Sequence, residues 1–486
     1  MNLLAIALLA FASLAQDDAP REEDFYRLVT LEEPEDLSLE VSGLAILADG
    51  TPLVATRRGQ LFRLAGAYAD DGAGVGYELF ADGLQEPLGL LEHEGWIYLA
   101  QRGELSRLRD VDGDGRADEL ETVCDAWRVS GNYHEYNFGP RLGPDGCFWI
   151  TTNKPFGGEP FGRVDWRGFA LRITPEGEML PTCSGLRSPA GVEASPWGAM
   201  FYTDNQGEWC GASKLSHLVP GSFHGHPWGR ESCELPAWTY AVPPEPPDGV
   251  LMGEVAGSVP SFALPAVWFP YEKMGKSPAG MVWDTTGGAF GPFAGQLFVA
   301  DQHHASILRV SLEEVGGHWQ GACYPFREGL QCGALRLAWG ADDSLFVGET
   351  NRGWGSRGRR TQGLERLLWT GEEPFELLAM TATPRGFRLE LTAPADPETA
   401  ADPASYSMES YTYLLHSSYG SDEVEKRQLE VTAVQLGEGG RVVELEVDGL
   451  RTPFVHELQA PGLRAADGQP LLHDAAYYTL IRRPTE

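Results

Sequence analysis

The sequence predicts an all-β protein, in which a six-bladed β-propeller is followed by a C-terminal β-sandwich. The main observation is a short repeated phrase, a Gly or Ala followed by x-hydrophobic-x-Arg-hydrophobic or a close variant of it. It occurs six times, at residues 59–64, 103–108, 168–173, 212–218, 305–310 and 363–368. Six copies indicate six repeated units, because each blade of a propeller buries its faces only against its neighbours.

A second phrase precedes each copy and consists of a turn and a short run of apolar and aromatic residues. These runs are residues 51–55, 96–100, 147–151, 199–202, 296–300 and 344–348, and their length and composition are typical of strands. A third phrase, Ser-Pro-Ala-Gly, stands at 188–191 and 277–280, with a weaker copy at 86–89. The repeated order of strand, turn, strand, loop and strand assigns residues 37–371 to the propeller.

The sequence patterns at the two ends of the chain differ from the repeats between them. Residues 1–15 form an apolar run that is too short to span a bilayer and ends in small residues, which predicts a cleaved signal peptide and an exported protein, periplasmic or extracellular. Residues 16–36 are expected to form a loose acidic arm. From residue 372 to 486, alternating segments such as 387–391 and 442–447 predict a separate sandwich of immunoglobulin or fibronectin type.

The composition excludes several functions. A formal charge of −33 disfavours binding to nucleic acid or anionic lipid. No later segment is apolar enough for a transmembrane anchor. The seven cysteines contain no C-x-x-C pair and no haem attachment motif, and export would permit one or two disulfides, whose pairing the spacing does not assign.

The strongest local motif predicts a calcium loop between residues 110 and 121. Asp110, Asp112, Asp114, Asp118 and Glu121 stand at loop positions 1, 3, 5, 9 and 12, Gly115 allows the sharp turn, and Arg116 offers its backbone carbonyl. The preceding residues have strand pattern, so the loop is expected inside a blade, without flanking helices. Its Ca²⁺ is expected to be structural.

Polar residues follow the apolar runs, and in a propeller the equivalent strand ends converge near the axis on one face. This set comprises Arg57, Gln101, Asn153, Asp204, Asn205, Asp301, Gln302, Glu349 and Asn351. Converging polar groups predict a pocket, although strand ends are also polar simply because turns are. His134, Arg187 and Arg336 complete the candidates, because histidine can take a proton near neutral pH and arginine can hold an anion.

Residues 41–371 resemble the glucose/sorbosone dehydrogenase family of six-bladed propellers, which use pyrroloquinoline quinone (PQQ), and are most similar to secreted planctomycete-type members. The resemblance is carried by residues 130–136, 142–146, 185–191, 201–207, 277–280, 297–300 and 335–337. It implies that His134 is the catalytic base and that Arg336 contacts the quinone. It also implies that Arg187 is a catalytic residue that lies beside the quinone where the cofactor takes up its reducing equivalents.

Some positions depart from the family pattern. Ser188 replaces an Asn, Ala334 replaces a second Arg, and the quinone-contacting Lys has no counterpart near residues 301–304. Since the haem motif is absent, electrons would leave through a separate acceptor such as a cytochrome.

Three functions remain open at this point. The first is a PQQ-dependent dehydrogenase that acts on a sugar or polyol, with Gln101, Asn153, Asp204 and Asn205 beside the cofactor. The second is a lactonase-like hydrolase that holds one metal through Asn153, Asp204 and Glu349. The third is a carbohydrate-binding or scaffold protein without catalysis.

Overall fold

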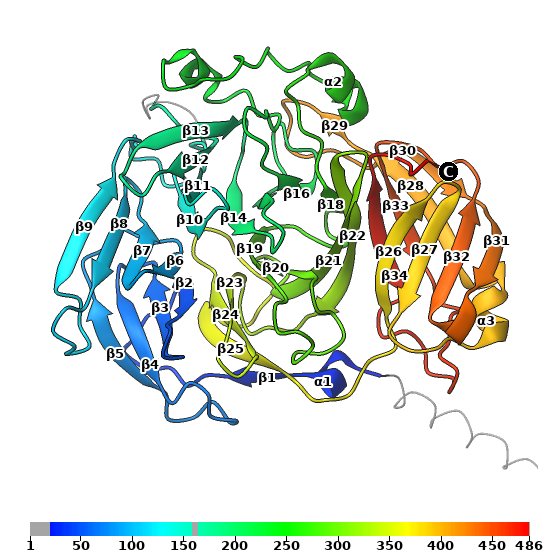
Figure 1. Ribbon diagram of the computed structural model, residues 1–486, viewed down its shortest axis with the longest axis horizontal. Coiled ribbons are helices and arrows are strands. Elements are labelled where there is room, and N and C mark those ends of the chain that lie inside the picture. The colour runs from blue at the N-terminus through cyan, green and yellow to red at the C-terminus, as the bar shows by residue number, and fades with distance from the viewer. Residues whose placement is uncertain (1–19, 158–163, 486) are drawn as a thin grey trace, which may run out of the picture.

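A computed structural model describes residues 20–157 and 164–485, and most of its regular structure is β-strand (Figure 1). The predicted signal peptide lies outside the described residues. The strands form four-stranded sheets for the most part, as expected for a propeller.

In the first three sheets the pairing order follows the chain, and all pairs are antiparallel. The first sheet contains β2 (Val41–Ile46), β3 (Pro52–Thr56), β4 (Leu61–Ala65) and β5 (Gly76–Ala81). The second contains β6 (Leu90–His93), β7 (Trp96–Ala100), β8 (Leu105–Arg109) and β9 (Glu119–Cys124). The third contains β10 (Asn137–Leu142), β11 (Phe148–Thr152), β12 (Phe169–Ile173) and β13 (Met179–Ser184).

The next three sheets recruit strands from more distant parts of the chain. The fourth contains β14 (Pro189–Ala194), β15 (Met200–Asp204), β16 (Ser213–His217) and β18 (Val267–Phe269). The fifth begins with β19 (Pro278–Trp283), β20 (Leu297–Asp301), β21 (Ser306–Val315) and β22 (His318–Arg327). The sixth contains β23 (Ala334–Trp339), β24 (Leu345–Thr350), β25 (Gln362–Trp369) and, as its outer strand, β1 (Tyr26–Thr30).

The expected loose arm is therefore partly ordered. Strand β1 pairs with β25 from Tyr26 opposite Trp369 to Thr30 opposite Glu365. The Tyr26 ring packs on Phe290 and Phe326, with ring centroids 5.2 and 4.7 Å apart. Burial of this ring and pairing with β25 hold the segment in place, although its composition is acidic.

The first strands of the six sheets contact one another in a closed ring: β2 with β6, β6 with β10, β10 with β14, β14 with β19, β19 with β23, and β23 with β2. This is the arrangement of a propeller, and Figure 1 shows the sheets around a common centre. The glycines of the Ser-Pro-Ala-Gly phrase allow the first strands of neighbouring sheets to approach closely. A Cβ at Gly191 would lie 2.1 Å from the Ala279 carbonyl oxygen, and one at Gly280 would lie 2.6 Å from that of Leu335.

The C-terminal region forms two sheets that share a hydrophobic core, which includes Leu377, Leu389, Val443, Met408, Leu458 and Tyr478. One sheet contains β26 (Leu377–Thr383), β27 (Gly386–Leu391), β32 (Val442–Val447) and β31 (Val431–Leu436). The other contains β34 (Ala475–Leu480), β33 (Phe454–Gln459), β28 (Ser407–Thr412) and β30 (Val424–Leu429). The second sheet continues the fifth sheet of the ring, because β34 pairs with β22.

The C-terminal region is thus joined to the ring more closely than the expectation of a separate module implied. A short pair, β17 (Val250–Leu251) with β29 (Leu414–Leu415), makes a second junction. One hydrophobic cluster includes Trp268 and Val299 of the ring together with Tyr413 and Tyr477. The helices are short: α1 (Glu22–Phe25), α2 (Met252–Ser258), α3 (Pro397–Ala401) and the 3-10 helices η1 (Arg230–Glu234), η2 (Pro403–Ser405) and η3 (Glu438–Gly440).

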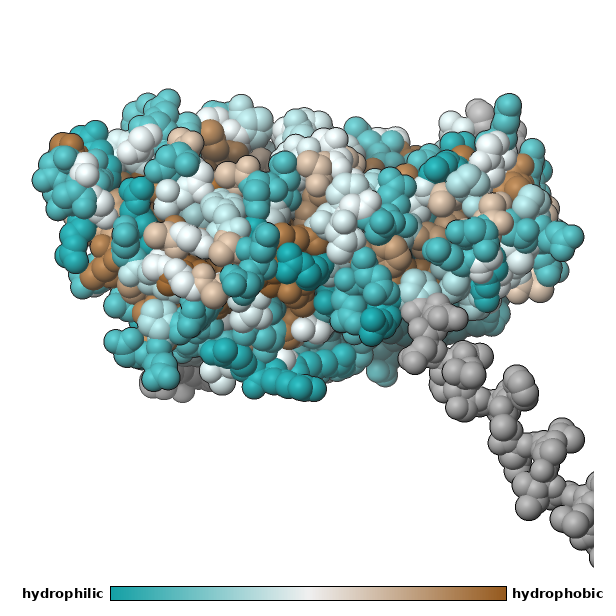
Figure 2. All heavy atoms as spheres, turned by 90° about the horizontal axis from the view of Figure 1, so that it is seen from below, coloured by the Kyte–Doolittle hydropathy of each residue, from teal (hydrophilic) through white to brown (hydrophobic). Residues whose placement is uncertain are grey.

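The seven cysteines all belong to the described residues, and all are buried and free of disulfide bonds. Among residues 20–157 and 164–485, none of the helices has the length and hydropathy that a bilayer crossing requires. Hydrophilic residues dominate the face of the molecule in Figure 2, with apolar residues in small groups between them.

Candidate functional site

A cavity of about 190 Å³ collects residues from several sheets of the ring, and six of the predicted candidates line it: Arg57, His134, Asn153, Arg187, Asn205 and Gln302. The other lining residues used below are Tyr136, Phe138, Phe156, Lys276, Arg352, Trp354 and Tyr419. The predicted base and the predicted quinone-side arginine therefore share one cavity.

His134 lies in the loop that leads into β10, and a buried carboxylate fixes the shape of this loop. Oε2 of Glu135 accepts hydrogen bonds from the backbone N–H groups of Ser130, Gly131 and Asn132, at 2.7, 3.2 and 3.2 Å. The Asn132 side chain in turn accepts the N–H of His134 at 3.0 Å. The imidazole packs on Phe156, with ring centroids 4.9 Å apart. Its position is therefore set by the fold before any ligand binds.

The environment of His134 favours the neutral imidazole. Burial lowers its pKa below 6.5, and the positive charges of Lys154, Arg102, Arg187 and Arg57 lower it further. A neutral imidazole at neutral pH has a free lone pair, which is the state that a general base requires.

Arg187 is held between two aromatic rings and a carboxylate. Its Cζ lies 4.7 Å from the ring centroid of Phe156 and 5.3 Å from that of Tyr419, and its Nη2 lies 2.8 Å from Oε2 of Glu208. A Cβ at position 207 would lie 1.9 Å from Cζ, so only glycine permits this packing. Burial alone would raise the pKa of Glu208, but Arg187 and Lys154 lower it to about 2.

The cavity lining is cationic, because it includes Arg57, Arg187, Lys276 and Arg352 and, among the described residues, no Asp or Glu. Each cation is paired with a carboxylate that does not itself line the cavity. Arg57 pairs with Glu86 at 2.5 Å, Arg352 with Glu40 at 3.0 Å, and Lys276 with Glu272. This arrangement presents positive charge to the cavity of a protein whose formal charge is −33.

Lys276 was not among the predicted site residues, although the sequence contains its signal. It precedes Ser-Pro-Ala-Gly at 277–280 just as Arg187 precedes the copy at 188–191. The repeat thus places a cation at the equivalent point of two neighbouring sheets. The repeat could not indicate Tyr419 as a site residue, because Tyr419 lies outside it.

Asp204 and Gln101 do not line the cavity, in contrast to their predicted role beside the cofactor. Oδ2 of Asp204 accepts the backbone N–H of Arg187 at 3.0 Å, and Oδ1 accepts that of Ser188 at 2.7 Å. Oε1 of Gln101 accepts the backbone N–H of Gln85 at 2.5 Å. These strand-end side chains satisfy the backbone of the preceding loop and so position it.

Arg336 also lies outside the lining of this cavity. Its guanidinium donates to the backbone carbonyls of Ser42, Leu88, Ala190 and Leu335, at 2.9, 3.0, 3.0 and 2.6 Å. It borders a central void of about 20 Å³, which has room for about one water molecule. A third cavity, of about 430 Å³, lies between the C-terminal ends of the first strands of the sheets. Trp283 and Trp339 border it. Arg336 therefore closes the centre of the ring.

The predicted calcium loop connects β8 and β9, and three of its carboxylates converge. Oxygens of Asp110, Asp112 and Asp118 lie within 4.8 Å of one another. Asp114 accepts the backbone N–H of Arg116 at 2.8 Å, and Glu121 pairs with Arg107 at 2.7 Å. Three carboxylates of the predicted set therefore lie close together, and Glu121 belongs to strand β9.

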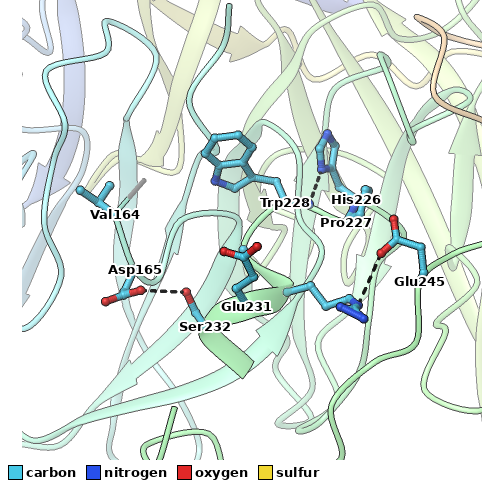
Figure 3. Close-up of a pocket in the computed structure, with 10 residues that line it drawn as sticks. Val164, Asp165, His226, Pro227, Trp228, Glu231, Ser232 and Glu245 are labelled. Atoms are coloured by element: carbon cyan, nitrogen blue, oxygen red, sulfur yellow. Dashed lines mark hydrogen bonds and ion pairs between the residues drawn. The ribbon is translucent and has the colours of Figure 1, made fainter. Parts of the chain in front are cut away.

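Another cavity, of about 320 Å³, has the opposite character (Figure 3). Asp165, Glu231 and Glu245 line it together with Arg230, which lies 3.7 Å from Glu245. None of the residues predicted for catalysis or cofactor binding lines it. Its carboxylates make it unsuitable for an anionic ligand, so the cationic cavity around Arg187 is the candidate site.

A family model described as a domain of unknown function (DUF7133) matches residues 63–220 of this chain. No curated protein matches the sequence. Solved structures do match it. A Trichoderma reesei protein of Carbohydrate-Active Enzymes Family AA12 is 14% identical, with a TM-score of 0.50 over 72% of this chain and 98% of that one.

Two other structures give similar values. A Thermus thermophilus protein described as an oxidoreductase (glucose dehydrogenase) is 22% identical, with a TM-score of 0.49 over 71% of this chain and 100% of its own. The PQQ-bound aldose sugar dehydrogenase of Streptomyces coelicolor is 17% identical, with a TM-score of 0.47 over 71% and 98%. At 14% identity, the likeness to the Trichoderma reesei structure shows a shared fold.

Proposed function

We propose that the protein is an exported oxidoreductase that uses PQQ to oxidise a hydroxyl group of a sugar or polyol. The observation that carries this proposal is the cationic cavity, in which a neutral His134 faces the same space as Arg57, Arg187, Lys276 and Arg352. An anion-binding cavity beside a base, in a strongly acidic protein, suits a carboxylated cofactor and an uncharged substrate.

The lining residues fit PQQ in chemical type. Its carboxylates would be held by Arg187, Lys276, Arg57 and Arg352, and Asn153 and Asn205 would supply amide hydrogen bonds. Bound there, the quinone would supply the two-electron acceptor for the hydride of the carbinol carbon. The cavity of about 190 Å³ is also lined by Trp354 and Tyr419, both of which remain exposed to solvent.

His134 has the role of the base in this proposal. The imidazole would take the proton of the substrate hydroxyl while the fixed loop holds it in place. The electrons would then pass to a separate acceptor, such as a cytochrome.

The finer architecture belongs to the same proposal. We assign six blades to residues 37–371, with β1 from the acidic arm at 16–36 completing the last of them, and a β-sandwich to residues 372–486. The signal peptide at 1–15 would direct export. The loop with Asp110, Asp112 and Asp118 would bind one structural Ca²⁺.

The lactonase alternative is less well supported by the geometry. Asp204 is engaged with backbone N–H groups, and Glu349 is fully buried outside the cavity lining, where burial and Glu365 raise its pKa. A protonated, buried carboxyl group is a poor metal ligand. Among the described acidic, histidine and cysteine side chains, only the loop at 110–118 gathers three groups close enough to hold an ion.

The test begins with an absorption titration of the purified protein with PQQ in the presence of Ca²⁺, followed by dye reduction with a panel of sugars and polyols. We expect a spectral shift on binding and turnover of at least one sugar. His134→Ala should retain the shift and lose turnover by about 100-fold or more. The acid limb of kcat/KM should lie below pH 6.5, because burial and nearby cations lower the pKa of His134.

Arg57→Gln provides the matched comparison, since it removes a cation from the lining but leaves the base in place. It should weaken the spectral titration more than it slows the saturated enzyme. Absence of any spectral shift, together with no dye reduction across the panel, would contradict the proposal and leave carbohydrate binding without catalysis as the better description.

A further inference from the structure

The C-terminal region contributes directly to the wall of the candidate site. The connection between β29 and β30 runs beside the ring residues at 207–211. Gly420 donates its N–H to the Gly207 carbonyl at 3.0 Å, and Ser421 donates to that of Gly211 at 2.8 Å. In the reverse direction, Trp209 donates to the His416 carbonyl at 2.8 Å. Backbone hydrogen bonds in both directions therefore attach this connection to the ring.

A second attachment holds the same connection from the other side. Strand β29 pairs with β17, and Asp248 accepts the backbone N–H and the hydroxyl of Ser417, at 2.8 and 2.7 Å. Tyr419 lies between these two attachments. Its backbone position is therefore determined by the ring, although the residue belongs to the C-terminal region.

The side chain of Tyr419 lines the cationic cavity and remains 57% exposed. Trp354, in the connection between β24 and β25, also lines it and is 44% exposed. The described chain exposes large aromatic side chains at few positions, namely Tyr133, Trp197, Trp354 and Tyr419. Two of these line the same cavity, so an aromatic surface is concentrated at its mouth.

We propose that Tyr419 is a substrate-binding residue, on which a pyranose ring stacks, and that the C-terminal region completes the active site in this way. This inference rests on the proposed function, which places the quinone in the cavity and hence the sugar at its mouth. The C–H face of a pyranose is apolar and weakly positive, so it is attracted to the π face of an aromatic ring. Trp354 offers a second such face.

The arrangement also explains why the ring of Tyr419 can bind sugar without being mobile. One part of it contacts the Arg187 guanidinium, at 5.3 Å from Cζ to the ring centroid, and the rest is open to solvent. A ring whose orientation is already set loses little conformational freedom when a ligand stacks on it. An acyclic polyol has no ring face and should gain less from Tyr419.

The experiment compares Tyr419→Ala and Tyr419→Phe, with Trp197→Ala as the control, since Trp197 is an exposed aromatic residue outside this cavity. The enzyme, loaded with PQQ and Ca²⁺, is assayed by dye reduction with glucose, xylose, cellobiose and glycerol. Tyr419→Ala should raise KM for the three sugars about 3- to 10-fold, with kcat within about two-fold. Tyr419→Phe and Trp197→Ala should behave as the wild type, and glycerol should distinguish the variants least.

Unchanged KM values for all three sugars in Tyr419→Ala would overturn the inference, as would a loss confined to kcat. Melting curves check the fold, and Tyr419→Leu replaces the alanine variant if that one fails to fold. If the wild type reduces no dye with any sugar, equilibrium titration measures the affinity of the wild type and of Tyr419→Ala for the same sugars. Sugar affinity that falls in Tyr419→Ala supports stacking even without turnover, whereas affinity independent of Tyr419, or none, overturns it.

Discussion

The side chain of Arg336 connects the backbone of several sheets of the ring, whereas it was expected to contact the cofactor. Its guanidinium joins backbone carbonyls from different sheets of the ring, and it is almost completely buried. Burial lowers its pKa to about 9, so the side chain is still mainly protonated at neutral pH. A cation with all of its hydrogen bonds to carbonyls has little left to offer a quinone.

We therefore predict that Arg336→Met lowers the free energy of unfolding by about 3 kcal/mol or more, because several buried carbonyls lose their donor. Thermal and urea unfolding of the variant measure this loss. PQQ affinity of the folded fraction should stay near the wild-type value, and Arg187→Met provides the contrast, with weakened PQQ binding. A stable Arg336→Met that no longer binds PQQ would restore the cofactor role that the family resemblance implied.

Residue chemistry could be predicted from the sequence where a side chain follows the repeat. His134 and Arg187 share the cavity, as expected. Asp204 and Gln101 stand at the predicted strand ends, but their oxygens are taken by backbone N–H groups of the preceding loops. The spacing of the repeat predicts that such a residue lies at the end of a strand. It does not predict which group its side chain will hydrogen-bond. Tyr419 enters from outside the repeat and left no signal.

At the scale of elements, the repeated phrases marked the second and third strands of the sheets closely. The phrase at 103–108 covers all but the last residue of β8, for example, and the run at 96–100 coincides with β7. Two strands could not be expected from the pattern. Strand β1 comes from an acidic segment and pairs with β25, which is distant in the sequence, and β18 joins its sheet after a long insertion that follows β16. Such pairings depend on tertiary contacts that a local pattern does not contain.

The loop between β8 and β9 allows a sharp test of calcium binding. We predict that Asp112→Asn combined with Asp118→Asn abolishes Ca²⁺ binding, because both remove carboxylate charge from the converging group. Glu121→Gln is the matched control and should leave the affinity almost unchanged, since Glu121 is engaged with Arg107 in the sheet. Calorimetric titration of the metal-free protein with Ca²⁺ measures all three. Equal losses in the control and the double variant would mean that Glu121 leaves Arg107 to become a ligand.

At the scale of the whole molecule, an ionic cluster joins a segment near the start of the described chain to one near its C-terminus. His473 lies between Glu376, 2.5 Å from Nδ1, and Glu22, 3.0 Å from Nε2. Arg327 pairs with Glu22 at 2.9 Å, and Arg309 lies 3.9 Å from Glu376. The cluster thus links α1, the fifth sheet and the C-terminal strands, and it explains why the acidic N-terminal segment is held in place.

The protonation of His473 makes this link dependent on pH. Burial alone would lower its pKa, but Glu376 and Glu22 raise it to about 9 from the ordinary value of 6.5. A folded pKa above the unfolded one means that the bound proton stabilises the fold. This contribution, on the order of 3 kcal/mol, is complete below pH 6.5 and is lost as the pH rises through 9.

We therefore predict that the melting temperature of the wild type falls between pH 6.5 and pH 9.5, and that His473→Gln melts lower at pH 6.5 with a smaller further decline. Glutamine can still donate one hydrogen bond but carries no titrating charge, so the variant isolates the proton from the packing. Scanning calorimetry over this range measures both proteins, and the His318→Gln variant, altered at an exposed histidine, controls for unrelated histidine effects. Parallel pH curves for the wild type and His473→Gln would show that the proton on His473 does not contribute to the stability of the fold.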